Sequence, residues 1–457
     1  MNKLSVGFAR TNITPMRNVG LAGYFISRPM NGVMDELEIN AIAVESGDNR
    51  ILLLSADLLY LQTYIADDFR AAISKATGVD PEAIFIHGTH THTAPFVDPN
   101  HASIKSEEER ELVREYLAFL RHRAVDVSLS AIDDLKPAKM GYGVSKASNI
   151  AFVRRYRMKD GTVRTNPGVN NPDILHPIGE IDDSVNVIRF DREGANSIAF
   201  VNFANHPDTV GGCKVSADWP GFVRSTVEKV LDNVNCIVFN GAQGDVNHVN
   251  VHPTGGYLND MFMDFDDVAR GYGHTRHLGR VITGALLQVW DKVEYVDVDS
   301  VRFAQKVTTV PSNRPDPSEV PEAKRINELH AAGRDAELPY TGMMLTTILA
   351  DARRKVRLEN GPDSFTMRFS AVSIGNIALF GVPGEPFNSI GRAVKAQAEG
   401  WDLVIPCCLT NGAEGYFPST DAYVEGGYEA RGSIFKEGIA ERIVENGLEL
   451  LNKIHTK

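Results

Sequence analysis

Short apolar runs typical of strands alternate along this chain with longer segments of helical periodicity, and this alternation limits the fold more than any other feature. Residues 41–45 (AIAVE) and 51–55 (ILLLS) predict buried strands joined by a turn, whereas residues 63–77 predict a helix. Similar patterns continue along the sequence, with predicted strands at 83–87, 185–191, 197–202, 235–240, 364–374 and 377–382, a β-rich stretch at 295–310, and predicted helices at 106–135, 216–232, 275–293 and 432–453. Because hairpins and crossovers both occur, we predict an α/β fold of mixed β-sheets flanked by helices.

The chain of 457 residues has no internal repeat and no low-complexity linker. A length of this size allows two or three domains of about 150 residues or one large unit. The most distinct segment begins with four prolines between Pro311 and Pro321 and continues with polar helical patterns. Strands are predicted on both sides of it, so we expect a single large domain over residues 1–457 with a helical surface insertion at 311–362.

Charge and cysteine content exclude several classes of protein. The formal net charge of −12 argues against binding to nucleic acid or to an anionic membrane surface. Cys213, Cys236, Cys407 and Cys408 form no CxxC motif, which favours reduced thiols. No apolar run reaches the roughly 18 residues of a membrane helix, and residues 1–11 lack the apolar segment of a signal peptide. We therefore expect a cytoplasmic protein without stable membrane association.

The densest chemical signal is a group of three histidines directly after the predicted strand at residues 83–86. The segment 88–95 reads GTHTHTAP, and His87 precedes it. His90 and His92 are two residues apart, so in an extended segment they point to the same side and can converge on one small ion. A position after a buried strand is where α/β enzymes usually place their sites. The sequence therefore predicts a metal site here, although a lone histidine at a strand end is more often structural.

Four further polar segments accompany this histidine cluster. Residues 205–208 (NHPD), 240–248 (NGAQGDVNH) and 384–386 (GEP) each follow an apolar strand, and Tyr416 and Tyr428 lie among glycines that indicate loops. The segment 240–248 lacks the endings of phosphate-binding loops. Each segment alone fits an ordinary connection between elements, but the histidine cluster and the segments 205–208 and 240–248 together predict one polar rim.

Taken in this order, these segments resemble the neutral/alkaline (non-lysosomal) ceramidase family, specifically its N-terminal catalytic domain. The similarity spans roughly residues 5–450 and rests on the following segments: the opening strand 6–15 (VGFARTNITP), 21–24 (LAGY), 55–58 (SADL), the histidine signature 88–95, the P-G-E motif at 383–385, and the twelve-residue separation of Tyr416 and Tyr428, with Y-E-A at 428–430.

The resemblance implies a zinc-dependent amide hydrolase and a specific set of site residues. In that family two histidines, one glutamate and one tyrosine bind zinc, and the matching positions here are His90, His206, Glu385 and Tyr416. The resemblance further implies His92 as the acid/base group, Tyr428 as the oxyanion donor, and Arg154 or Arg155 as a substrate contact. Zinc would activate a water molecule for attack. Asp57, Asp218 and Asp245 follow strand ends, and we expect them to orient the ligand imidazoles.

Departures from the family pattern bear on the substrate. Asn247 occupies the active-site position where the family has a serine in G-D-V-S, and His248 follows it as a candidate substrate contact. The chain ends at Lys457, without the C-terminal immunoglobulin-like domain of the secreted ceramidases. We therefore expect a small, soluble N-acyl substrate, and the oligomeric state stays open. Two alternatives are a metal-dependent enzyme acting on a carbohydrate or ester bond and a non-catalytic ligand-binding homologue.

Overall fold

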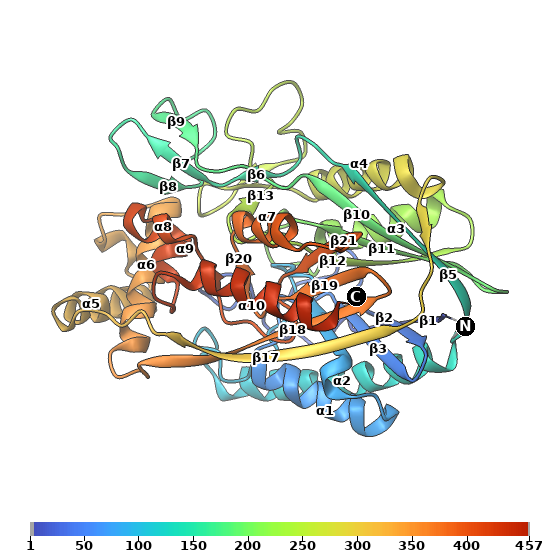
Figure 1. Cartoon of the computed structure of the whole chain (residues 1–457). Helices are drawn as coiled ribbons and strands as arrows, with labels where there is room; N and C mark the ends of the chain where they lie inside the picture. The colour runs from blue at the N-terminus through green and yellow to red at the C-terminus, as the bar shows by residue number, and fades with distance from the viewer. Residues whose placement is uncertain (1–3, 456–457) are drawn as a thin grey trace.

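Two mixed β-sheets form the centre of the molecule in the computed structural model, which describes residues 4–455 (Figure 1). Within these residues, the larger sheet has nine strands in the order β12-β11-β10-β5-β1-β2-β3-β4, with β16 also paired to β5. Their bounds are β1 Ser5–Asn12, β2 Glu38–Ser46, β3 Asn49–Ala56, β4 Ile84–Gly88, β5 Lys136–Lys146, β10 Ser184–Arg192, β11 Ser197–Phe203, β12 Val234–Asn240 and β16 Glu294–Val296. Two parallel pairs, β3 with β4 and β11 with β12, interrupt an otherwise antiparallel arrangement.

The second sheet has the order β17-β18-β19-β21, and its strands β19 and β21 are buried on both faces. Its strands are β17 Val301–Pro311, β18 Ser364–Ile374, β19 Ile377–Gly381 and β21 Leu403–Cys407. Along β19, Ile377 and Leu379 pack into the core shared with the larger sheet, whereas Ala378 and Phe380 pack toward the C-terminal helices. Because neighbouring side chains of a strand point to opposite faces, both faces of this strand must be apolar.

The helices cover the outer faces of the two sheets. Their bounds are α1 Thr63–Thr77, α2 Glu107–Asp133, α3 Asp218–Val230, α4 Tyr272–Trp290, α5 Val320–Ala331, α6 Gly342–Leu358, α7 Asn388–Gln397, α8 Thr420–Glu425, α9 Tyr428–Gly432 and α10 Ile439–Ile454. In the larger sheet, α1 and α2 lie against the β1–β4 part, and α3 and α4 against the β10–β12 part, while α7 and α10 cover the second sheet (Figure 1). The result is four layers: helices, sheet, sheet, helices.

Local sequence explains where two of these helices begin and end. Ser106 caps α2 by accepting a hydrogen bond from the backbone N–H of Glu109, and three glutamates follow in the first turn. Helix α1 ends at Gly78, whose φ of 74° is a left-handed conformation that glycine adopts at little cost. The segment 311–362 contains α5 and α6, as its helical patterns predicted.

Short strands outside the two large sheets were not predicted. They pair as β6 Phe152–Val153 with β13 Val246–Asn247, β14 Phe262–Met263 with β15 Ala269–Arg270, β20 Glu385–Pro386 with β22 Tyr416–Phe417, and β7 Arg155–Met158 with β8 Val163–Thr165 and β9 Ile174–Pro177. Pairs of two to four residues carry too little periodicity to be recognised in a sequence.

Three predictions about the C-terminal half need correction. The helix predicted at 432–453 begins later, because α10 spans Ile439–Ile454 and follows an irregular segment, residues 433–438, that ends at Gly438 with a φ of 92°. The predicted β-rich stretch 295–310 divides between the two sheets, because β16 pairs with β5 and β17 with β18. Tyr416 and Tyr428 do not lie in loops: Tyr416 is in β22, and Tyr428 begins α9. No helix within residues 4–455 combines the length and the apolar character needed to cross a membrane.

Candidate metal centre

The residues implied as metal ligands come from four segments that meet beside the ends of several strands. His90 follows β4 and His206 follows β11, both within three residues of the strand end. Glu385 lies in β20 and Tyr416 in β22, and these two residues are direct partners in a parallel pair. Backbone pairing therefore places the carboxylate and the phenol side by side, although they are far apart in sequence.

The side-chain atoms of these residues converge closely. The Nε2 atoms of His90 and His206 are 3.1 Å apart, and Glu385 Oε2 lies 3.1 Å from the first and 3.2 Å from the second. The Tyr416 hydroxyl lies 3.4 Å from His206 Nε2. The imidazoles and the carboxylate are buried. Four zinc ligands at about 2.0–2.2 Å from the ion, placed at the corners of a tetrahedron, would be roughly 3.4 Å from one another. The separations found here are close to that value.

The hydrogen bonds of the two imidazoles show that this cluster suits a cation. His90 Nδ1 lies 2.8 Å from the carbonyl oxygen of Leu59, and His206 Nδ1 lies 3.1 Å from that of Gln243. A carbonyl only accepts, so each Nδ1 carries the proton and donates, which leaves a lone pair on each Nε2 of the neutral ring. Two lone pairs and a carboxylate oxygen thus face one another, and Glu385 Oε2 has no hydrogen-bond donor among the described residues. Nitrogen and oxygen donors of this kind fit zinc.

The acceptors of these Nδ1 protons differ from the sequence prediction. Asp57, Asp218 and Asp245 were expected to orient the imidazoles, but backbone carbonyls do so instead. Asp57 forms a buried ion pair with Arg224. Asp218 accepts hydrogen bonds at the start of α3, and Asp245 accepts one from the backbone N–H of Asn388.

The backbone at His90 adopts an uncommon conformation. Its φ of 69° lies in the left-handed region, which costs a residue with a side chain about 1–3 kcal/mol. Backbone hydrogen bonds from Thr89 to Ala56 and from His90 to Leu58, both 2.8 Å, hold this turn in place. Strain of this kind is found most often at functional sites.

His92 is the third imidazole of the cluster. Together with His90 and His206 it forms a group of three histidines that can hold a metal ion, with the candidate ligand atoms within 4.8 Å of one another. Its ring centroid is 4.9 Å from that of His90 and 5.6 Å from that of His206. Both of its ring nitrogens lack a hydrogen-bond partner among the described residues, and burial lowers its pKa well below the usual value. A neutral imidazole with two nitrogens unpartnered within residues 4–455 therefore lies beside the other two rings.

An ion-pair network that the sequence analysis missed lies behind His92. Asp208 Oδ1 is 3.5 Å from His92 Nδ1, and Arg270 donates to both oxygens of Asp208 at 3.0 and 2.7 Å. Arg270 also pairs with Asp266, and Tyr24 donates to Asp208 at 3.0 Å. Burial opposes ionisation of Asp208, but Arg270 holds its pKa below the usual range. The network fixes a negative charge next to His92. Asp208 is the last residue of the segment 205–208 that contains His206, and this position was the one available sequence signal.

Arg154 connects the two tyrosines of the site. Its guanidinium lies 5.4 Å from the ring centroid of Tyr416 and 5.8 Å from that of Tyr428, and the two rings are 5.5 Å apart. Arg154 also donates to the fully buried Glu429 at 2.6 Å. Burial raises the pKa of both phenols, and Arg154 only partly offsets this, so Tyr428 remains a hydrogen-bond donor at neutral pH.

The charge state of Glu385 follows from its neighbours. Burial alone would raise the pKa of this carboxyl, but the contacts with His90 and His206 lower it well below its usual value. Burial also lowers the pKa of His206, and Arg154 adds to that effect. The carboxyl group of Glu385 is therefore ionised.

Three other predicted site residues lie at the edge of this arrangement. Arg155 pairs with Glu425 and lies 5.3 Å from the ring centroid of Phe387, so Arg154 rather than Arg155 contacts the tyrosines. Asn247 is buried and donates to Asn166 at 3.0 Å. His248 is also buried, and its Nε2 lies 2.7 Å from the carbonyl oxygen of Ala269. The roles assigned to Asn247 and His248 remain predictions.

Two solved structures are similar to this chain over nearly all of its length. One is the neutral ceramidase from Pseudomonas aeruginosa, with a TM-score of 0.69, 17% sequence identity, and coverage of 100% of this chain and 76% of that chain. The other is a ceramidase complexed with C2, with a TM-score of 0.69, 16% identity, and coverage of 99% and 75%. The fold is ceramidase-like. No protein-family model and no curated protein matches the sequence, so the similarity is one of fold.

Proposed function

We propose that this protein is a zinc-dependent hydrolase that cleaves an amide (N-acyl) bond of a small-molecule substrate. The observation that carries the proposal is the convergence of His90 Nε2, His206 Nε2 and Glu385 Oε2 within 3.1–3.2 Å of one another. Because both Nδ1 atoms donate to carbonyl oxygens, the facing atoms are all electron-pair donors. The ceramidase-like fold supports an amide as the bond that is cleaved.

In this proposal Tyr416 completes a ligand set with His90, His206 and Glu385. A bound zinc ion would lower the pKa of a water molecule to about 7 and polarise the substrate carbonyl. This chain's own residues supply the remaining steps. His92, with both nitrogens unpartnered within residues 4–455, accepts a proton and returns it to the leaving nitrogen, which leaves poorly unless protonated.

Tyr428 and Arg154 act on the substrate oxygen in this scheme. The Tyr428 hydroxyl stays protonated and donates a hydrogen bond to the developing negative charge. Arg154 holds Tyr416 and Tyr428 in their relative orientation through its position beside both rings. Glu429 accepts a hydrogen bond from this guanidinium and so helps to hold it in place.

The proposed substrate is a soluble N-acyl compound, and the proposed location is the cytoplasm. Free thiols at all four cysteines, three of them buried, suit a reducing compartment. A net charge of −12 does not favour docking on an anionic membrane.

Metal content by mass spectrometry tests the metal site directly. We expect about one zinc per chain in the wild type, and its loss in both His90→Ala and Glu385→Ala. His176→Ala is the matched control, because this histidine is exposed in β9, away from the cluster, and the variant should keep its metal. A wild type that holds no metal and takes up none from added zinc would exclude the proposal.

Activity on matched compounds tests the bond that is cleaved. We expect the zinc-loaded protein to hydrolyse short-chain acyl p-nitroanilides. The rate enhancement over the uncatalysed reaction should be larger for these amides than for matched p-nitrophenyl esters or glycosides. Preference for the ester or the glycoside would support a different reaction at the same metal. No turnover of any of these compounds by the loaded protein would favour a ligand-binding role.

A further inference from the structure

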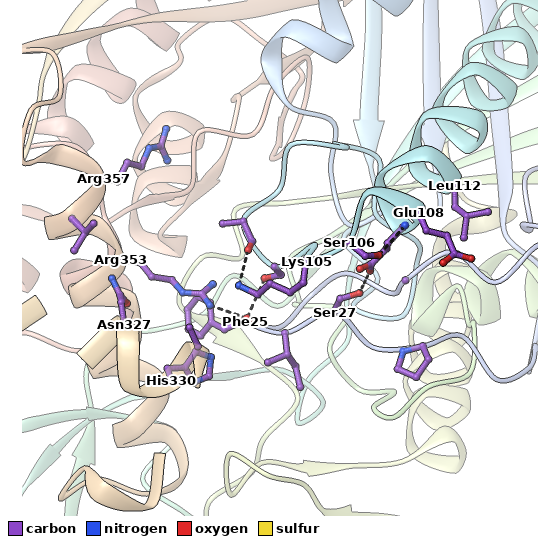
Figure 2. Close-up of a pocket in the computed structure, with 18 of the residues that line it drawn as sticks. Phe25, Ser27, Lys105, Ser106, Glu108, Leu112, Asn327, His330, Arg353 and Arg357 are labelled. Atoms are coloured by element: carbon purple, nitrogen blue, oxygen red, sulfur yellow. Dashed lines mark hydrogen bonds between the residues drawn. The ribbon is translucent and has the colours of Figure 1, made fainter. Parts of the chain in front are cut away.

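A large cavity lies outside the metal centre, between the start of α2, the segment 25–29 and the helices α5 and α6 (Figure 2). Its volume is about 890 Å³, within the range of small-molecule sites. None of the candidate metal ligands lines it. The cavity is therefore a second candidate binding site with its own chemistry.

Three cations line this cavity without a carboxylate partner. Lys105, Arg353 and Arg357 have no acidic side chain within 4.0 Å among residues 4–455. The chain has twelve more acidic than basic residues, and most of its arginines do pair with a carboxylate. His330, which also lines the cavity, is already bound to Asp335. Three cations around one space, without an ion-pair partner in the described part of the chain, favour an anionic ligand on their side of the cavity.

The hydrogen bonds of these cations leave most of their donors free. Arg353 donates to the Phe25 carbonyl oxygen at 2.8 Å, and its guanidinium lies 4.3 Å from the Phe25 ring centroid. Lys105 donates to the carbonyl of Ala102 at 3.2 Å. Arg357, exposed and one helical turn from Arg353 on α6, makes no hydrogen bond among the described residues. An arginine presents five N–H groups, so both guanidinia retain donors for a carboxylate or phosphate.

The remaining lining includes apolar, acidic and neutral polar side chains. Ile26, Leu112 and Val356 contribute apolar surface. Glu108 and Glu109 lie on the α2 side, where Glu109 accepts a hydrogen bond from Ser27. In Figure 2 the arginines extend from α6 on one side, whereas Glu108 and Leu112 come from α2 on the other. An anionic group is therefore repelled from the α2 side and attracted to the α6 side.

We propose that this cavity binds a small molecule with an apolar body and one anionic group, a carboxylate or a phosphate, held by Arg353 and Arg357. Arginine is suited to both anions because its planar guanidinium can bind two oxygens at once. Lys105 adds a third positive charge. The proposal does not depend on the hydrolase activity proposed above.

One lining residue of the cavity, Phe25, lies near Tyr428. The ring centroids of Phe25 and Tyr428 are 6.5 Å apart. The Arg353 guanidinium lies over the Phe25 ring and donates a hydrogen bond to the Phe25 carbonyl oxygen. A ligand that engages Arg353 therefore acts on a side chain next to Tyr428.

Calorimetric titration of the full-length protein tests the proposal. The probes are phenylacetate and phenyl phosphate, and phenylacetamide is the uncharged control of nearly the same shape. Each titration is made first on the protein as purified. It is repeated on protein from which a chelator has removed the metal and dialysis has removed the chelator, because a probe that binds to the metal ion would then no longer bind. We expect one site per chain in both preparations, with phenylacetamide binding at least about tenfold more weakly. The tighter of the two anions identifies the group that the site takes.

Substitutions locate the site. We expect Arg357→Gln and Arg353→Gln each to weaken binding of the anionic probe about tenfold or more. Arg357 is exposed, so its variant should fold normally even if Arg353→Gln does not. Arg325→Gln is the matched control, because this exposed arginine on α5 already pairs with Glu322 and does not line the cavity. Equal binding to wild type and Arg357→Gln, equal binding of phenylacetamide, or no binding at millimolar concentration would each overturn the proposal.

Discussion

His87 should make the stability of this protein depend on pH in a way that the structure allows to be calculated. The side chain is fully buried, its Nδ1 lies 2.8 Å from the carbonyl oxygen of Cys408, and its Nε2 accepts a hydrogen bond at 3.0 Å from the Asn240 backbone N–H. Only the neutral ring satisfies both contacts, because protonation would place a second N–H against a donor. Burial is the main cause that lowers the pKa of His87 from 6.5 to about 4.

The sign and the size of the effect follow from this difference in pKa. The folded state holds the proton less tightly than the unfolded chain, so the contribution of His87 is present above pH 6.5 and is lost as the pH falls toward 4. The loss is about 2 kcal/mol between pH 7.5 and 5.0, and about 3 kcal/mol once both states are protonated. Other buried histidines titrate too, so only a comparison with a His87 variant isolates this contribution.

Urea unfolding at pH 7.5 and 5.0 provides the measurement. The decrease in unfolding free energy on acidification should be about 2 kcal/mol larger in the wild type than in His87→Gln, whatever the absolute stability of the variant. His176→Gln, which replaces an exposed histidine, should behave as the wild type. If the wild type and His87→Gln lost the same unfolding free energy between pH 7.5 and 5.0, the reasoning would be refuted.

Three further predictions concern the metal centre. Tyr428→Phe should keep its metal but lower kcat roughly 10²–10³-fold, as expected for loss of one oxyanion donor, measured by steady-state kinetics on the substrate found in the screen. Arg154→Met should lower the unfolding free energy by about 3–5 kcal/mol, because it leaves the buried carboxylate of Glu429 without its partner, and urea unfolding measures this loss. Gly244→Ala should reduce zinc content, because its Cβ would lie 2.5 Å from the carbonyl oxygen of Glu385 and displace that ligand.

Each of these predictions has a control that can contradict it. Loss of metal in Tyr428→Phe would show that this phenol is a structural part of the ligand set rather than a hydrogen-bond donor to the substrate. The double variant Arg154→Met/Glu429→Gln should regain part of the stability that Arg154→Met loses, and no recovery would contradict the proposed cause. Gly284→Ala on α4 is the control for Gly244→Ala, because nothing lies within 4 Å of its added Cβ, and equal metal loss in both would refute the steric argument.

The longer elements were predictable because their periodicity extends over enough residues. Helix α1 spans the predicted residues 63–77, and β3 contains the predicted strand at 51–55. The irregular segment 433–438 before α10 was missed, although Gly432 and Gly438 at its ends are residues that often interrupt helices.

The candidate site was predictable in its residues more than in its contacts. His90 and His206 could be placed at strand ends, but nothing local indicates that Glu385 and Tyr416 pair across separate strands. The orientation of the imidazoles depends on backbone carbonyls, which every residue possesses and no sequence pattern distinguishes. The contact of Asp208 with His92 arises from two loops that only the folded sheets bring together.

Because the site is built from distant parts of the chain, a bound metal ion would contribute to the stability of the folded protein. His90 belongs to the first fifth of the sequence and follows β4 of the larger sheet. Glu385 belongs to the last fifth and lies in β20, shortly after β19 of the second sheet. An ion bound between them would close a very long loop of the chain, as a disulfide does. The chain entropy lost on closing a loop grows only slowly with the length of the loop, so this length adds little to the cost. Metal would therefore act as a removable cross-link between the two sheets. Its binding free energy would add to the stability of their contact in proportion to the logarithm of the free metal concentration.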